Sequence, residues 1–270
     1  LDEIEQRRFA DLAVFPEDVE VPWATLEKLW DTSAAATRRL CLRLGDLALL
    51  LKVDFAARTI RIHDVVHAYM IGNTPDITAL HRRFLDAYGI ADWTQLPPNE
   101  TFLWNYLAFH LVQADRSAEL HGLFADDHWL QARVVHDGYI YDGYIADLMT
   151  AWQVAHSEAK SQIQALKHDD ALIDCVRFAL IRTTINSLAA SYVPEFLVQA
   201  VTARSEDWSP ARATSILRNI PGPYARAKLG RLLLALPDPD LDRLTIGNIA
   251  LAAAKAISDE ESRAEPLKAL

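Results

Sequence analysis

The chain has 270 residues; 51% are hydrophobic, 37 are acidic and 27 are basic, so the formal net charge is −10. This acidic balance argues against a general nucleic-acid-binding surface, because such surfaces carry basic patches. Cys41 and Cys175 are too few for a disulfide framework, and no apolar run reaches the ~18 residues of a membrane-spanning helix. The nine glycines are about half the usual share of ~7%, which favours helices. We therefore expect a mostly α, cytoplasmic protein.

The first part of the chain contains short helices followed by a hairpin. Three helices, two strands and a fourth helix are predicted over residues 3–14, 23–30, 33–47, 49–53, 59–62 and 63–71. Pro22 stands in the first turn of the second helix, where its missing N–H costs nothing, and the two strands with residues 54–58 between them are predicted to form a small β-hairpin. This order of elements predicts a winged-helix domain with a small β-hairpin wing over residues 1–72.

Residues 73–160 are predicted to form a second, all-helical domain. Thr74-Pro75-Asp76 is a helix-start signal, with a cap, a proline at the first position and an acid in the first turn. Periodic apolar residues then predict helices over residues 77–88, 100–114, 117–124, 127–135 and 139–166, the last with breaks. The segment 92–99, with two prolines, is predicted to be a loop.

Residues 161–270 continue as helix after helix, separated by prolines. Ile220 with Arg226-Ala227 recurs as Ile257 with Arg263-Ala264, at an offset of 37 residues. A period in the thirties is typical of stacked helix pairs, and the spacing of Ser258 and Glu261 predicts a capping box in the second copy. We expect an α-solenoid-like helical-repeat region that is truncated in this chain and acts as a sensor.

Motifs of common enzymes are absent from the sequence. It contains no G-x-x-x-x-G-K-[ST], no G-x-G-x-x-G and no G-x-S-x-G, which excludes the usual phosphate cradle, dinucleotide fingerprint and nucleophile elbow. Neither cysteine has the context of a nucleophile. The chain is therefore not expected to be an enzyme.

The stretch His63-Asp64-Val65-Val66-His67 joins the second strand to the fourth helix. Histidines four apart share a helix face, as in H-E-x-x-H zinc sites. Asp64 is one methylene shorter than the glutamate of such sites, and no third ligand is indicated. A helix cap followed by a partly buried histidine is the favoured interpretation.

A winged helix often reads DNA through its third helix, so a DNA-binding transcription regulator stays open as the alternative function. That helix carries Arg38, Arg39 and Arg43. The hairpin adds Lys52, Arg58 and Arg61, which are offset by Asp54 and Asp64. Because phosphate contacts supply most non-specific affinity, these few charges favour a solvated helix face.

Several motifs resemble those of a known family. They are Phe9–Phe15, Asp18–Pro22, Leu29–Asp31, Ile62–Val65, Tyr106–Leu111, Glu119-Leu120 and Asp127–Ala132. In this order they resemble the NB-ARC class of STAND nucleotide switches, and over residues 5–145 the winged helix and helical arm of the apoptotic protease-activating factor family. Ile62-His63-Asp64 is similar to the "MHD" motif of this class, with isoleucine at the first position.

The resemblance implies a role for two residues. In such proteins the histidine of this motif contacts the β-phosphate of ADP in a neighbouring nucleotide domain and holds the switch closed; here that role falls on His63, with Asp64 supporting the turn.

ADP or ATP is then the cofactor of a longer protein, and none is expected for this chain alone, which lacks the nucleotide domain. The implied partners are a nucleotide-binding domain upstream of residue 1, an unknown protein or small ligand at the helical repeats, and further copies of the protein on activation. Neither a membrane nor nucleic acid is an expected partner.

Overall fold

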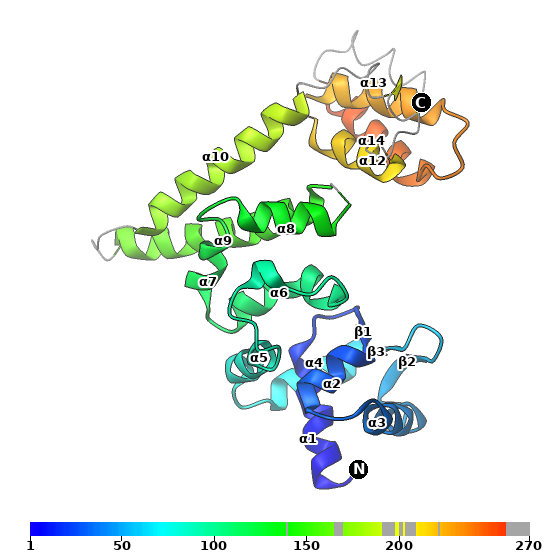
Figure 1. The fold of residues 1–270 in the computed structure, drawn as a ribbon, viewed down its shortest axis with the longest axis vertical. Helices are drawn as coiled ribbons and strands as arrows, with labels where there is room; N and C mark the ends of the chain where they lie inside the picture. Colours follow the sequence, from blue (N-terminus) through cyan, green and yellow to red (C-terminus); the bar gives the residue numbers. More distant parts are fainter. Residues whose placement is uncertain are drawn as a thin grey trace. The chain divides into compact units, whose positions relative to one another are not determined.

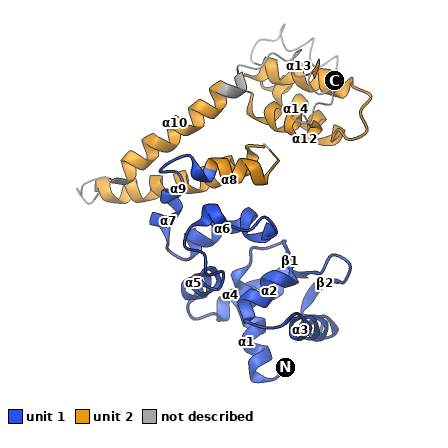
Figure 2. Cartoon of the chain, viewed as in Figure 1, with its two compact units in different colours: residues 1–129 blue, residues 130–270 orange. Residues whose placement is uncertain are grey.

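The computed structural model describes residues 1–138, 140–164, 170–190, 198–199, 202, 209–220 and 222–257. Within these residues the chain is mostly helical and contains one three-stranded antiparallel sheet (Figure 1). Contacts divide the chain into two compact units, residues 1–129 and 130–270 (Figure 2). The domain boundaries after residues 72 and 160 stay predictions. No helix in the described part of the chain is long and apolar enough to cross a membrane.

The first unit contains helices α1 to α7, two 3-10 helices and the sheet. Their bounds are α1 Glu3–Asp11, η1 Leu12–Val14, β1 Glu20–Pro22, α2 Trp23–Trp30, α3 Ala34–Asp46, β2 Leu50–Asp54, β3 Thr59–Ile62, α4 Asp64–Asn73, α5 Ile77–Asp86, η2 Trp93–Gln95, α6 Thr101–Gln113 and α7 Ser117–Gly122. Helix α2 has the predicted bounds Trp23–Trp30, but Pro22 is its N-cap, with extended backbone angles, and not a residue of its first turn.

The sheet has the strand order β1-β3-β2, so β3 is central. The predicted hairpin of β2 and β3 is confirmed, and Val53 of β2 lies opposite Ile60 of β3. Strand β1 was not predicted; it pairs antiparallel with β3 and places Val21 opposite Ile60. A strand of three residues with one buried side chain is too short to show the alternation by which strands are recognised.

The core of the first unit is built around η1. Leu12, Ala13, Val14 and Phe15 are all buried, and η1 packs against α1, α4 and α5. The prediction of one helix over residues 3–14 was wrong, because α1 ends at Asp11 and a tighter turn follows. Pro16 disfavours helix at Phe15, and the burial of all three η1 side chains holds the chain in this turn.

The sequence predicts that the tryptophans pack in the core, and the burial of those in the described residues confirms this for most of them. Five are buried: Trp23, Trp30, Trp93, Trp104 and Trp129. Trp30 donates from Nε1 to the carbonyl of Arg8 at 2.9 Å, and the rings of Trp104 and Trp129 stack with centroids 5.2 Å apart. Trp152 is half-buried, and Trp208 lies outside the described residues.

The second unit contains the rest of the helices. They are α8 His128–His136, which begins at the end of the first unit, α9 Asp142–Gln164, α10 Asp170–Ala190, α12 Pro210–Asn219, α13 Pro223–Leu234 and α14 Arg243–Lys255. The predicted breaks within 139–166 are not seen in α9, which is one helix. Asp142, at its start, accepts hydrogen bonds from Ser215 Oγ (2.7 Å) and Asn219 Nδ2 (3.1 Å) and pairs with Arg218, which fixes α12 to α9.

The sequence repeat with an offset of 37 residues lies only partly within the residues that the structure describes. Ile220 and Ile257 are both buried and both follow the end of a helix, α12 and α14. Arg226 donates from Nε and Nη2 to the carbonyl of Ile220 at 3.1 and 2.6 Å. In the first copy these hydrogen bonds join the start of α13 to the end of α12. Arg263, Ala264 and the predicted Ser258–Glu261 capping box lie outside the described residues, and the solenoid stays a prediction.

Helices α13 and α14 approach closely at Gly230, and this contact allows a test. A Cβ at Gly230 would lie 2.5 Å from Cβ of Ala250, whereas a Cβ at Gly247 of α14 would meet nothing within 4 Å. We expect Gly230→Ala to lower the free energy of unfolding by about 1–3 kcal/mol through overpacking. The matched variant Gly247→Ala should raise it by roughly 0.4–1 kcal/mol. Urea unfolding of both variants checks this, and equal effects would contradict the described packing.

Candidate functional site at the start of helix α4

The predicted site residue His63 lies between β3 and α4 and caps the helix. Strand β3 is fixed by the burial of Ile60 and Ile62. His63 has extended backbone angles (φ −78°, ψ 133°), and its Nδ1 accepts a hydrogen bond from the N–H of Val65 at 3.3 Å. Because Nδ1 accepts, the neutral ring carries its proton on Nε2. The exposed side chain therefore offers an Nε2–H donor at the start of a helix.

His67, one helical turn later, has a different surrounding. Its side chain is buried, Nε2 lies 2.7 Å from the carbonyl oxygen of Phe15, and Nδ1 lies 3.6 Å from a carboxylate oxygen of Glu17. Nε2 therefore donates to Phe15 and ties α4 to the core segment after η1. The prediction of a cap at His63 is confirmed, and His67 is more deeply buried than the sequence predicted.

A zinc site at this histidine pair finds no support. His63 is exposed while His67 is buried and uses Nε2 for a backbone carbonyl. In the described ranges, no group of three or more His, Cys, Asp or Glu side chains could hold a metal ion.

The surface beside His63 is acidic at one residue and apolar at two. Asp64 is exposed in the first turn of α4, where a carboxylate interacts favourably with the helix dipole. Val65 is 72% exposed and Tyr69 66% exposed. Free N–H groups at a helix start favour an anion, and Val65 and Tyr69 add two exposed apolar side chains to α4, which directly follows β3 (Figure 1).

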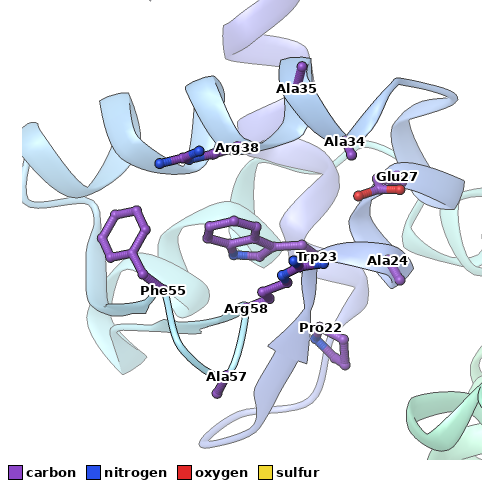
Figure 3. A pocket seen from close by; sticks show the side chains of 10 residues that line it. All are labelled: Pro22, Trp23, Ala24, Glu27, Ala34, Ala35, Arg38, Phe55, Ala57 and Arg58. Carbon is purple, nitrogen blue, oxygen red and sulfur yellow. The ribbon is translucent and has the colours of Figure 1, made fainter.

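The basic residues near α3 do not form one uninterrupted patch. Three of the six on α3 and the hairpin form ion pairs: Arg43 with Glu5, Lys52 with Glu20 and Asp54, and Arg61 with Asp18. Arg38 and Arg58 line a pocket with Trp23 and Phe55 (Figure 3). The face that a DNA-reading winged helix would use is therefore partly neutralised, with two arginines gathered at a hollow.

A buried pair of histidines was not predicted. His81 of α5 and His110 of α6 approach with their Nδ1 atoms 3.0 Å apart. Burial lowers the pKa of His81 to about 4, and burial followed by the proximity of His81 lowers the pKa of His110 well below its usual value. Each histidine occupies a buried position of its own helix, and the sequence gives no sign that the two helices bring them together.

The environment of Cys41 is that of a buried structural cysteine. Burial raises the pKa of the Cys41 thiol to about 12, so it stays protonated, and only the thiolate is reactive. Cys175 is half-buried on α10, and the two cysteines are not joined by a disulfide.

A protein-family model matches part of the chain. Residues 77–171 match the family model described as the APAF-1 helical domain. The match begins at the first residue of α5 and runs through α6, α7, α8 and α9 into α10. No curated protein matches the chain. The chain thus contains an Apaf-1-like helical region, of the kind that is associated with NB-ARC signalling proteins, and it includes the motifs at Tyr106–Leu111 and Asp127–Ala132.

Proposed function

We propose that the chain is the regulatory part of a STAND-type signalling ATPase. Residues 1–72 are its winged helix, 73–160 its helical arm and 161–270 the beginning of a helical-repeat sensor. One observation carries the proposal: the Apaf-1-like region from residue 77 directly follows three helices, a three-stranded sheet and a helix that is capped by an exposed histidine. This is the order that the resemblance to NB-ARC proteins requires.

In this proposal His63 binds a phosphate of ADP held by a nucleotide domain upstream of residue 1. The Nε2–H of His63 and the backbone N–H groups in the first turn of α4 are the donors. The hydrogen bond from the N–H of Val65 to Nδ1 of His63 fixes the orientation of the imidazole ring. A charge-assisted hydrogen bond contributes about 1.5–3 kcal/mol. That is enough to shift a closed/open equilibrium by roughly 10- to 100-fold.

The exposed face of α4 fits the same closed state. Val65 and Tyr69 are large apolar residues that water surrounds when this chain stands alone. A nucleotide domain lying over His63 would cover both and contribute apolar burial, about 25 cal/mol for each Å² removed from water. Loss of the phosphate contact at His63 would then favour separation of the nucleotide domain from the whole exposed face of α4, which gives the switch two distinct states.

The helical arm would relay a signal from the sensor. Ligand binding to the helical repeats shifts the arm and releases the closed state, after which copies of the protein assemble. A ligand does this only if it binds the open state more tightly than the closed state. Its chemical class is not indicated by the residues of the second unit.

The direct test is the rate of ADP release in the longer protein that carries the nucleotide domain. We expect His63→Ala to speed ADP dissociation roughly 10- to 100-fold, because it removes a phosphate donor. The matched control is His128→Ala, which removes another exposed histidine, one that pairs with Asp126. Displacement of a fluorescent ADP analogue measures both rates, and an unchanged rate in His63→Ala overturns the proposal.

A further inference from the structure

A pocket on the first unit is separate from His63. It has a volume of about 730 Å³ and is lined by the starts of two helices and the tip of the hairpin (Figure 3). This volume lies in the ~300–1,000 Å³ range of small-molecule sites. Its chemistry is given by four side chains: Trp23, Arg38, Phe55 and Arg58.

The indole of Trp23 forms the floor of this pocket and has an unused donor. Its side chain is 8% exposed, and Nε1 is shielded from solvent and has no hydrogen-bond partner in the described part of the chain. In Figure 3 the ring lies between α3 and the β2–β3 turn, with the Arg58 side chain next to it. A buried N–H without an acceptor costs about 1–3 kcal/mol. The Arg58 side chain is exposed, and an acceptor that reaches Nε1 after a change of its rotamer would remove this cost while staying in contact with the guanidinium.

The walls of the pocket favour an anion. Pro22 gives α2 no side-chain cap, and the first-turn amides of α2 and α3, at Ala24 and Ala34, have no acceptor within their helices. Two helix starts therefore direct positive partial charge into the pocket. Arg38 and Arg58 add two exposed guanidinium groups that form no ion pair among the described residues, against one carboxylate on the wall, Glu27.

The hairpin tip is held in a fixed shape and supplies an apolar side. Asp54 accepts hydrogen bonds from the N–H groups of Ala56 (3.0 Å) and Ala57 (2.9 Å), and Arg58 takes a left-handed conformation with φ 54°. The carbonyl of Arg58 accepts from the N–H of Trp23 at 2.9 Å. Phe55, half exposed, meets the Trp23 ring edge to face at 5.8 Å. An apolar or flat group could pack beside Phe55 without disturbing the turn.

We infer that this pocket binds a small organic anion: a carboxylate or phosphate held by Arg38, Arg58 and the Trp23 Nε1–H, joined to a ring that packs against Phe55. The inference does not rest on the nucleotide switch, because none of the lining residues belongs to α4. The ring adds apolar burial to an anionic contact that alone is weak in water.

The test follows the indole N–H resonances of the ¹⁵N-labelled 270-residue chain, with Trp23→Phe used to assign Trp23. Four probes are added in turn: inorganic phosphate, adenosine, adenosine monophosphate and phenylacetate. We expect saturable shifts of the Trp23 resonance with adenosine monophosphate, phenylacetate or both, which separates the phosphate from the carboxylate source, and a weaker shift with phosphate. Adenosine should cause none. The resonance of Trp30, whose Nε1–H donates a hydrogen bond to the backbone carbonyl of Arg8, should not shift.

Variants separate the pocket from general electrostatics. Arg38→Gln and Arg58→Gln should each weaken binding at least roughly tenfold, the effect of losing one charge-assisted hydrogen bond. Arg39→Ala removes a neighbouring exposed charge outside the pocket and should leave affinity within about twofold. A Trp23 resonance that no probe moves, or an equal loss with Arg39→Ala, overturns the inference. Tighter, Arg38-dependent binding of a short DNA duplex in a low-salt gel shift also overturns it, in favour of nucleic acid.

Discussion

Asp147→Ala is expected to lower the free energy of unfolding of the second unit by about 3–5 kcal/mol, because it breaks a buried ion pair from one side. Asp147 of α9 and Arg133 of α8 are both buried, with Oδ2 3.4 Å from Nε. Arg133 also lies 3.3 Å from Asp137. A Cβ at Gly143 would fall 2.3 Å from Nη2 of Arg133, so the guanidinium packs directly against the backbone at the start of α9.

The double variant Arg133→Leu/Asp147→Leu is the matched control. Replacing both charges by apolar groups removes the desolvation cost together with the attraction, so we expect it to recover most of the stability that Asp147→Ala loses. Urea unfolding followed by circular dichroism measures both. A loss under about 1 kcal/mol for Asp147→Ala, the value of an exposed pair, would contradict a buried role.

Stability is also expected to fall as the pH is lowered from about 6.5 to 4, on the order of 3 kcal/mol from His81 alone. The pKa of His81 is lowered to about 4 by burial, and that of His110 is also lowered. In the unfolded chain both titrate near the usual ~6.5. Between these two pKa values the unfolded chain binds more protons than the folded chain, so lowering the pH favours unfolding. Above pH 6.5 both histidines are neutral in the folded and in the unfolded chain, and the free energy of unfolding no longer depends on them.

The geometry of the pair explains the sign. One Nδ1 must donate and the other accept across 3.0 Å, and Phe84 lies 4.5 Å from the His110 ring by centroids. A second proton would place two donors face to face among apolar rings. The variant His81→Phe/His110→Leu should lose the pH dependence between 6.5 and 4 relative to the original chain. An equal slope in thermal unfolding of both chains would show that other groups cause it.

Local signals predicted much of the first unit. The start of α5 at Ile77 was predicted from Thr74-Pro75-Asp76, although the cap is Asp76, whose carboxylate accepts from Ala79 N–H at 2.8 Å. Thr74 instead donates to the carbonyl of Met70 at 2.8 Å and closes α4. Both polar residues could be assigned to a helix end from sequence, but which end each serves depends on where α4 stops.

Features that depend on contacts between distant segments were not predictable. Strand β1 exists because Val21 pairs with β3, and η1 because four side chains are buried together. The pocket needs the hairpin tip to reach the start of α2, so Arg38 and Arg58 appeared only as scattered charges. The cap at His63 was predictable because it is local: it depends on a strand that ends just before it and a helix that begins just after it.

The central proposal, that His63 holds ADP in the closed state, is tested most directly by the nucleotide content and mass of the proposed longer protein, in which a nucleotide domain precedes this chain. We predict that purified His63→Ala contains less bound ADP than the original protein and elutes as a larger assembly when ATP is added, while His128→Ala matches the original in both. Nucleotide is quantified after denaturation, and mass by light scattering. Equal ADP content and equal mass in His63→Ala and the original protein would contradict the claim.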